Sequence, residues 1–198
     1  MSDLIDMEFT ASEVQVLLQQ LFPKRKLVLS QLTFFLQAGV ARPTGESFCR
    51  KRRCYRLADI LPIACVLQLK EEGIPLKNIA DVPSILQNNL SRIFNVCCGT
   101  DSANSCRLMG CGGNVSLIFN DSENPKSAHQ MLIEMLGISA GSDDRDPYSV
   151  DHTDYSASTN SSGGLLGGGL LWGIDVSAIA MQLMEAANSS DRMIRRAA

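Results

Sequence analysis

The amino-acid sequence predicts a mostly α-helical fold. Two short helices and a strand pair are followed by an amphipathic helix and a small α/β or irregular C-terminal region. Apolar residues recur at three- and four-residue spacing through most of residues 10–98, and a stretch around Pro43 and Gly45 interrupts that pattern. Residues 139–169, in contrast, are rich in Ser, Gly and Asp. With 45% hydrophobic residues, the chain has the composition of a globular protein with a core.

The first predicted helix covers residues 10–22. Its apolar residues have the spacing of a single buried helix face, and they are Val14, Leu17, Leu18 and Leu21. Thr10 or Ser12 is expected to cap this helix, and Pro23 is expected to end it.

A second short helix is predicted over residues 27–39, after a basic link. Its inward-facing residues are expected to be Leu29, Leu32, Phe35 and Leu36. Gly39 is expected to end this helix, because glycine adopts the left-handed conformation of a C-terminal cap without strain.

Residues 40–57 predict two short strands joined by a turn. Pro, Thr, Gly and Glu lie at the centre of this stretch, and Val40 on one side and Cys54, Tyr55 and Leu57 on the other supply apolar flanks.

The later elements are expected in the following order: a helix at 58–73, a helical turn at 74–79, a strongly amphipathic helix at 83–98, a strand at 114–120, a helix at 127–137 and a last amphipathic helix at 174–187. The chain is therefore divided into a module at 8–82, the helix at 83–98, a Cys-containing loop, strand and helix at 99–138, a flexible linker at 139–169, and a C-terminal helix with a basic tail at 170–198.

Positive charge is concentrated in one part of the chain. The net charge is −3, yet residues 24–56 contain nine Lys or Arg against a single acid, Glu46. Such segregation favours a polyanionic partner at one site. A scattered basic surface without a partner is the alternative.

Helix, basic link, helix, two-stranded wing and helix is the order of elements in a winged helix-turn-helix. A short helix fits the major groove of DNA, and flanking cations neutralise phosphates, which gives affinity that does not depend on base sequence. We therefore expect double-stranded DNA as the partner.

Residues 8–82 resemble the MerR-type transcription regulators. The stretch "LTFFLQAGVARP" carries Phe34 and Phe35 where that family has its pair of aromatics. The spacing of Arg53, Tyr55, Asp59 and Gly73, and the segment "GIPLKNI", also match the family pattern. Thr33 departs from it, since an arginine usually stands there, and the two phenylalanines lack the hydroxyls of the family's tyrosines.

These patterns predict which residues contact DNA. Ser30, Gln31 and Thr33 are expected in the groove, whereas Phe34 is a candidate contact or part of the core and Phe35 is expected in the core. Phosphate contacts are expected from Lys24, Arg25, Lys26, Arg42, Arg50, Lys51, Arg52 and Arg53. Tyr55 either donates its hydroxyl to a phosphate or closes the wing against the core.

The resemblance also implies a homodimer, because members of the family dimerise. The apolar stripe of the helix at 83–98 is the first candidate for that interface, through Ile85, Leu86, Leu90, Ile93 and Phe94. Packing of this stripe inside its own chain, against the strand at 115–119, is an equal alternative, and the helix is shorter than in the family because Gly99 ends it.

Four cysteines cluster after this helix, at Cys97, Cys98, Cys106 and Cys111. Thiolates are soft ligands for Zn, Cu(I) or an iron–sulfur cluster, and metal- and redox-sensing members of the family have cysteines in a loop at this point. The spacing matches no metal-binding pattern, however, so structural thiols are favoured and no cofactor is expected.

The leading interpretation is a sequence-specific transcriptional regulator in the cytoplasm, associated with the nucleoid, with RNA polymerase left open as a further partner. An architectural or recombination accessory protein, similar to an excisionase or a phage packaging subunit, is the alternative. A metal- or redox-sensing regulator is a lesser one. No enzyme is expected, because the chain has no Gly-rich phosphate loop after a strand, no paired histidines and no serine elbow. No secretory signal or membrane segment is expected either.

Overall fold

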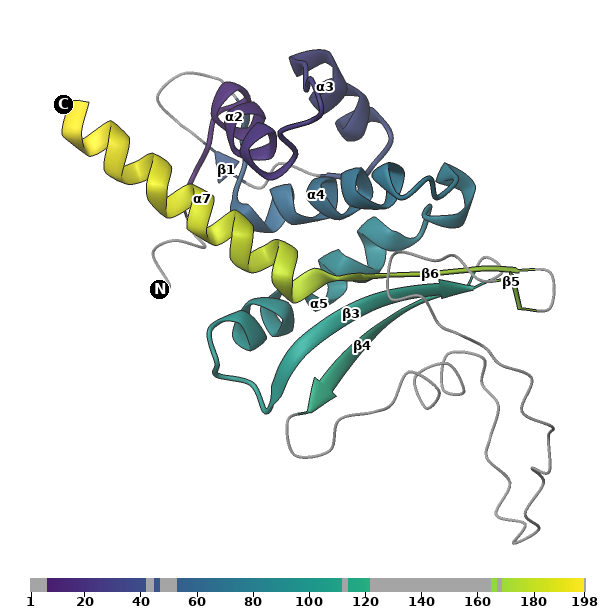
Figure 1. Ribbon diagram of the computed structural model, residues 1–198. Coiled ribbons are helices and arrows are strands. Elements are labelled where there is room, and N and C mark those ends of the chain that lie inside the picture. The colour runs from purple at the N-terminus through teal and green to yellow at the C-terminus, as the bar shows by residue number, and fades with distance from the viewer. Residues whose placement is uncertain are drawn as a thin grey trace, which may run out of the picture.

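The structure, a computed structural model, describes residues 7–41, 45–46, 53–111, 114–121, 165–166 and 169–197. The described part is mostly α-helical with a small antiparallel sheet, as the sequence predicts (Figure 1). Its helices are α2 (Ala11–Leu21), α3 (Leu29–Gln37), α4 (Leu57–Glu71), the 3-10 helix η1 (Leu76–Asn78), α5 (Val82–Cys97) and α7 (Val176–Ala197). Its strands are β1 (Gly45–Glu46), β2 (Arg53–Cys54), β3 (Ala103–Cys111), β4 (Asn114–Asp121), β5 (Leu165–Leu166) and β6 (Gly169–Asp175).

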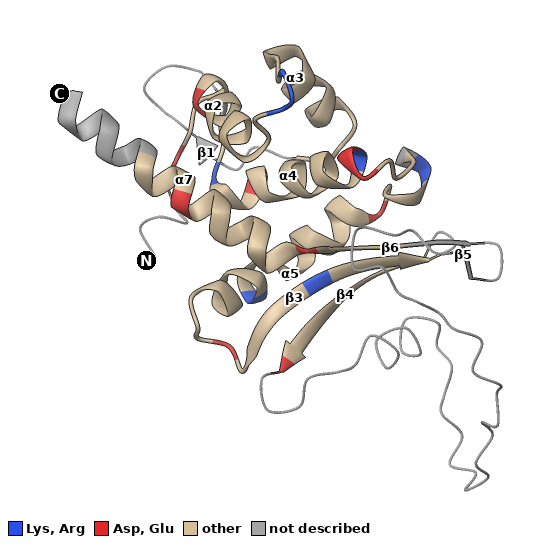
Figure 2. Ribbon diagram, viewed as in Figure 1, with Lys and Arg blue, Asp and Glu red and all other residues tan. Residues whose placement is uncertain are grey.

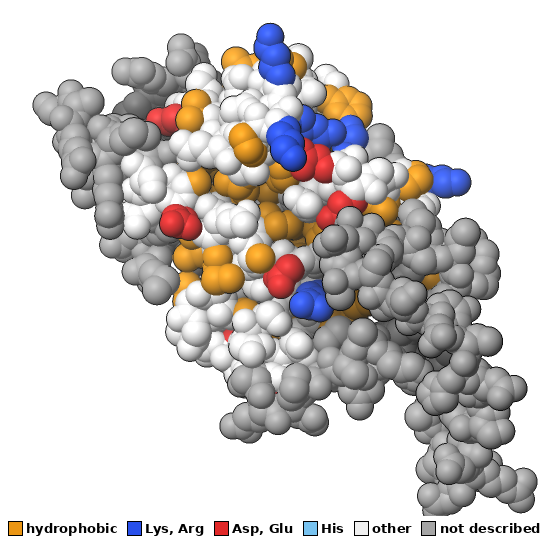
Figure 3. All heavy atoms as spheres, viewed as in Figure 1, with side chains coloured by type: hydrophobic (Ala, Val, Ile, Leu, Met, Phe, Trp, Pro, Cys, Tyr) orange, Lys and Arg blue, Asp and Glu red, His pale blue; other side chains and the backbone are white. Residues whose placement is uncertain are grey.

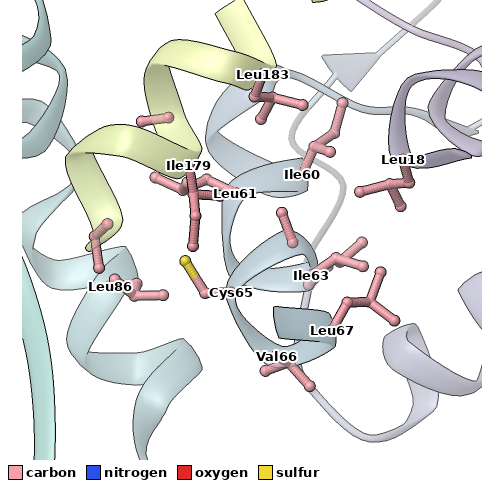
Figure 4. Close-up of a cluster of buried hydrophobic side chains, with 14 of the residues drawn as sticks. Leu18, Ile60, Leu61, Ile63, Cys65, Val66, Leu67, Leu86, Ile179 and Leu183 are labelled. Carbon is pink, nitrogen blue, oxygen red and sulfur yellow. The ribbon is translucent and has the colours of Figure 1, made fainter. Parts of the chain in front are cut away.

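Helix α4 lies at the centre of the core. Side chains from α2, α5 and α7 surround it, including Leu18, Leu86 and Leu183, all of which are at most 1% exposed (Figure 4). The predicted face of α2 supplies its part of this core, since Val14, Leu17 and Leu18 are buried. At its start, the Thr10 hydroxyl accepts from the Glu13 N–H and the Glu13 carboxylate accepts from the Thr10 N–H, which forms a capping box.

The larger sheet has the strand order β4-β3-β6-β5, with every neighbouring pair antiparallel. Strand β3 pairs with β4 from Ala103 to Cys111 and with β6 from Arg107 to Cys111. Helices α5 and α7 pack on β3 (Figure 1). The sheet therefore joins segments that are far apart in sequence and closes the side of the core opposite α2.

A glycine and a tryptophan face each other where β3 meets β6. Gly110 is the register partner of Trp172, whose side chain is 5% exposed. A Cβ atom at Gly110 would collide with Cε2 and Cζ2 of the indole ring. The absence of a side chain at Gly110 is thus what lets the indole lie on β3.

Several local predictions are confirmed. Strands β1 and β2 form an antiparallel pair, with Gly45 opposite Cys54. Gly39 follows α3 with a φ of 71°, and its N–H donates to the Leu36 carbonyl oxygen, as in a glycine cap. The strand expected at 114–120 is β4, and the helix expected at 83–98 is α5.

Three expectations are corrected. Leu29 was expected to face inward but is 46% exposed. It is the first residue of α3, and the buried residues of this helix are Leu32 and Phe35. The cysteine-rich stretch is not a loop, since residues 103–111 form β3. Strands β5 and β6 begin inside the segment 139–169, so its described residues belong to the sheet and not to a linker.

The last helix also starts later and runs further than expected. The Asp175 carboxylate accepts from the Ala178 N–H and from the Ser177 hydroxyl, which places the start of α7 at Val176. The helix continues to Ala197, through the segment that was expected to be a basic tail. The helix predicted at 127–137 lies outside the described residues. None of the helices in the described part is long and apolar enough to cross a lipid bilayer.

Candidate nucleic-acid interface

Helix α3 presents most of its surface to solvent. It lies at the end of the molecule away from β4, packs on α2, and buries Leu32 and Phe35 (Figure 1). The predicted groove contacts Ser30, Gln31 and Thr33 are all exposed. Phe34 is 51% exposed and Phe35 is 4% exposed, so the structure separates the two aromatics into a surface residue and a core residue.

The connection between α2 and α3, residues 22–28, is held by two glutamines of α2. The Gln15 side-chain amide donates to the Leu27 carbonyl oxygen at 2.7 Å, and the Leu27 N–H donates to Gln19 Oε1 at 3.1 Å. Because Phe22 and Leu27 are buried, the connection has two apolar anchors as well as these hydrogen bonds. Sequence reasoning missed the glutamines, although their four-residue spacing places both on one side of α2.

Two of the three predicted cations of this connection face solvent. Lys24 and Lys26 are exposed, and none of the ion pairs among the described side chains involves either of them. Arg25 is half-buried, and its Nη1 donates to the Leu67 carbonyl oxygen on α4 at 3.3 Å. Arg25 therefore ties the connection to α4, while Lys24 and Lys26 are available to a partner.

A hollow of about 360 Å³ lies between α3 and the C-terminal end of α4. Its lining includes Ser30, Gln31 and Phe34 of α3 together with the cations Arg25 and Lys70. Sequence reasoning missed Lys70, because only the fold brings the end of α4 beside α3. The exposed acids Glu71 and Glu72 follow it and limit the positive surface on that side.

Charged side chains are unevenly distributed on this face of the molecule (Figures 2 and 3). Lys and Arg side chains gather in the connection before α3 and at the end of α4, with hydrophobic and acidic side chains beside them (Figure 3). A surface that combines cations with a projecting helix is suited to a polyanion that has apolar groups of its own.

Only part of the predicted basic wing lies within the described residues. Arg42, Arg50, Lys51 and Arg52 lie outside the described residues, and of Arg53 only the backbone is described, in β2. Tyr55 is 3% exposed, and its N–H and carbonyl group exchange hydrogen bonds of 2.8 Å with Phe9. Of the two roles expected for Tyr55, the structure favours closure of the wing against the core.

The stripe expected to form a dimer interface is largely used inside the chain. Leu86 and Ile93 are 0% exposed and Phe94 is 3% exposed, in contact with neighbouring core elements. Helix α5 packs on α4, α7, β3 and β4. These three side chains are thus used for packing inside the chain, which was the alternative to a dimer interface, whereas Ile85 and Leu90 are half-buried at the edge of the core.

The clustered cysteines lie on regular elements. Cys97 belongs to the end of α5, Cys98 follows it, and Cys106 and Cys111 belong to β3. The fold adds Cys65 of α4, whose sulfur lies on the side toward Leu86 and Ile179 (Figure 4). Within the described residues, no group of three or more His, Cys, Asp or Glu side chains is placed to hold a metal ion.

Burial keeps the thiols of Cys65, Cys97 and Cys106 protonated, because it raises the pKa of each. It raises the pKa of Cys97 to about 11 and that of Cys106 to about 12, and in both cases a neighbouring cysteine raises the pKa further by Coulombic repulsion. Burial also raises the pKa of Cys65, by more. Because the thiolate is the form that binds soft metals and attacks electrophiles, Cys65, Cys97 and Cys106 have the properties of core residues.

Raising the pH from about 8 to about 10 is expected to lower the free energy of unfolding by about 1 kcal/mol through Cys106. The unfolded chain loses this proton near its ordinary pKa of 9.0, whereas the folded chain keeps it until about 12. The stabilisation is therefore complete below pH 9 and is lost as the pH rises toward 12. Urea unfolding at several pH values checks this, and Cys106→Ala should show a shallower pH dependence than the unmodified protein. Equal slopes for the two proteins would rule it out.

A scan of the chain against models of known protein families matches none of them, and no curated protein matches it either. The resemblance of residues 8–82 to MerR-type regulators accordingly stays a prediction.

Proposed function

We propose that the protein binds double-stranded DNA through a winged helix-turn-helix and acts as a sequence-specific transcriptional regulator. In this proposal α2 and α3 form the helix-turn-helix, and the β1–β2 pair is the base of the wing. The observation that carries it is the exposed face of α3 beside Lys24 and Lys26, which are free of ion pairs with other described side chains. The helix would lie in the major groove, and the lysines would contact the phosphates beside it.

The way α3 is held supports this proposal. Only one face of the helix is used for packing, and its N-terminal end is positioned by Gln15, Gln19 and Arg25. A reading helix needs such support, because base contacts require the side chains to be held in a fixed register. Lys70, on the far side of the hollow beside α3, would add a phosphate contact.

A second candidate function is supported by the burial of α5. Because Leu86, Ile93 and Phe94 pack inside the chain, α5 offers a smaller surface for dimerisation than a MerR-type regulator requires. An accessory protein that binds tandem DNA sites as separate monomers needs no such surface. Protection of one symmetric site would favour the regulator, and protection of several tandem sites would favour the accessory protein.

The proposal is tested by incubating the purified full-length protein with sheared genomic DNA from its source at about 50 and about 200 mM salt. Recovery of discrete fragments, with an affinity that falls steeply with salt, is the expected result. Equal recovery of all fragments would exclude sequence-specific regulation, and recovery of none would exclude DNA binding altogether.

A further inference from the structure

The outward face of α3 contains apolar and amide side chains but no cation. Its exposed residues are Leu29, Ser30, Gln31, Thr33, Phe34 and Gln37. In the major groove, guanine is most often read by Arg or Lys, adenine by Asn or Gln, and the thymine methyl group by apolar side chains. Because this face has glutamines and apolar side chains but no Arg or Lys, its composition favours A·T over G·C base pairs.

We propose that α3 reads A·T base pairs in the major groove, with Phe34 packing on thymine 5-methyl groups. This proposal rests on the proposed function, in which α3 is the helix that enters the groove. Lys24, Lys26 and Lys70 lie off the helix, where they contact phosphates and carry no sequence information.

Phe34 lies at the centre of the outward face. Ser30 is four residues before it and Gln37 three residues after it, so the three side chains follow one line along the helix. The Phe34 ring is half-exposed and makes an edge-to-face contact with Phe35, with ring centroids 6.0 Å apart and an interplanar angle of 63°. An aromatic side chain has only two χ angles, so a methyl group can pack on this ring at little cost in side-chain entropy.

The polar side chains of the face complement adenine. A glutamine amide can accept from adenine N6 and donate to N7 at the same time. Gln31 Oε1 accepts from the Val28 N–H at 3.3 Å in an exposed position, a long hydrogen bond that is readily exchanged for one to a base. Gln37 is exposed one turn after Thr33, so amide groups flank the phenyl ring at both ends of the face.

A protein partner is the competing occupant of this surface. Phe34 and Phe35 also line a hollow of about 450 Å³ between α3 and the start of α5, where an apolar peptide could bind. Lys24 and Lys26, in the connection before α3, make no ion pair with a described side chain and favour a polyanion, so we argue for DNA and leave a peptide as an outcome of the test.

The test begins with selection of bound duplexes from a random pool by the full-length protein. In the selected site each thymine is then replaced singly by uracil, which removes only the 5-methyl group and keeps the base-pairing edge. Loss of one packed methyl corresponds to about a fourfold weaker affinity. We expect an A·T-rich site in which at least one such replacement has this effect.

Phe34→Ala completes the test. The variant should bind the thymine site more weakly and should no longer distinguish thymine from uracil at the sensitive position. Met181→Ala is the matched control, because Met181 is 50% exposed on α7, away from α3, and this variant should bind and discriminate like the unmodified protein.

The outcomes separate the two proposals. A selected site dominated by G·C pairs, uracil replacements without effect, or a Phe34→Ala variant that still distinguishes thymine from uracil would overturn A·T reading while leaving DNA binding intact. If the unmodified protein selects no duplex at all, the proposed function fails and this inference fails with it, and the surface would then be a site for protein contacts.

Discussion

Replacing Gly110 with alanine is expected to lower the free energy of unfolding by about 3 kcal/mol, at the upper end for an overpacked core. The new Cβ would overlap the indole ring of Trp172, which is buried and lies directly across from it in the β3–β6 register. The ring is rigid, so β3 and β6 must move apart or the tryptophan must leave its position. Urea unfolding followed by tryptophan fluorescence measures the change, since Trp172 is the only tryptophan in the chain.

Gly173→Ala is the matched control for this substitution. Gly173 lies in β6 next to Trp172, but a Cβ there would be 3.4 Å from the Leu108 carbonyl oxygen and from Met109 Cγ, which is ordinary van der Waals contact. Its effect should stay within about 1 kcal/mol, because little has to move and alanine reduces the conformational freedom of the unfolded chain. In the Trp172→Leu background, where unfolding is followed by circular dichroism because the chain's one tryptophan is gone, Gly110→Ala should lower the free energy of unfolding by less than it does in the unmodified protein. Additive effects would show that the indole is not what the new methyl group meets.

Elements that depend on neighbouring residues could be predicted from the sequence. Helix α2 has its cap, its apolar face and its stop within a few residues, and Gly39 ends α3 by a local conformational preference. The exposed groove candidates on α3 also follow from periodicity, since Leu32 and Phe35 fix which side is buried. The β1–β2 pair needed only a turn between two short strands.

Elements that depend on partners far away in the sequence could not be predicted. Residues 165–169 read as the end of a Gly-rich linker because glycine disfavours strands, yet β5 and β6 begin there, and β6 pairs with β3 across more than fifty intervening residues. Neither Gly110 nor Trp172 shows a sequence pattern that predicts its position. Their pairing across β3 and β6 explains why one is a glycine and why the indole of the other is buried. The role of Tyr55 likewise depended on Phe9, which lies far upstream, and that of Lys70 on the packing of α4 beside α3.

The double substitution Lys24→Ala/Lys26→Ala is expected to weaken binding to duplex DNA and to make the affinity less sensitive to salt. Each phosphate contact contributes about 0.9 to the slope of log affinity against log salt, so loss of two contacts lowers the slope by about 1.8. The ratio of wild-type to variant affinity should therefore fall about tenfold between about 50 and about 200 mM salt. Titrations of one duplex at several salt concentrations measure both quantities.

The salt dependence is what distinguishes a phosphate contact from an indirect effect on the fold. A variant that merely loosened the connection between α2 and α3 would lose affinity by a similar factor at every salt concentration, because the number of released counterions would not change. Lys77→Ala/Arg107→Ala removes the same charge from exposed positions on η1 and β3 and should leave the slope near that of the unmodified protein. If the two double variants lower the slope equally, DNA responds to the net charge of the protein, and α3 with its lysines is not the binding surface.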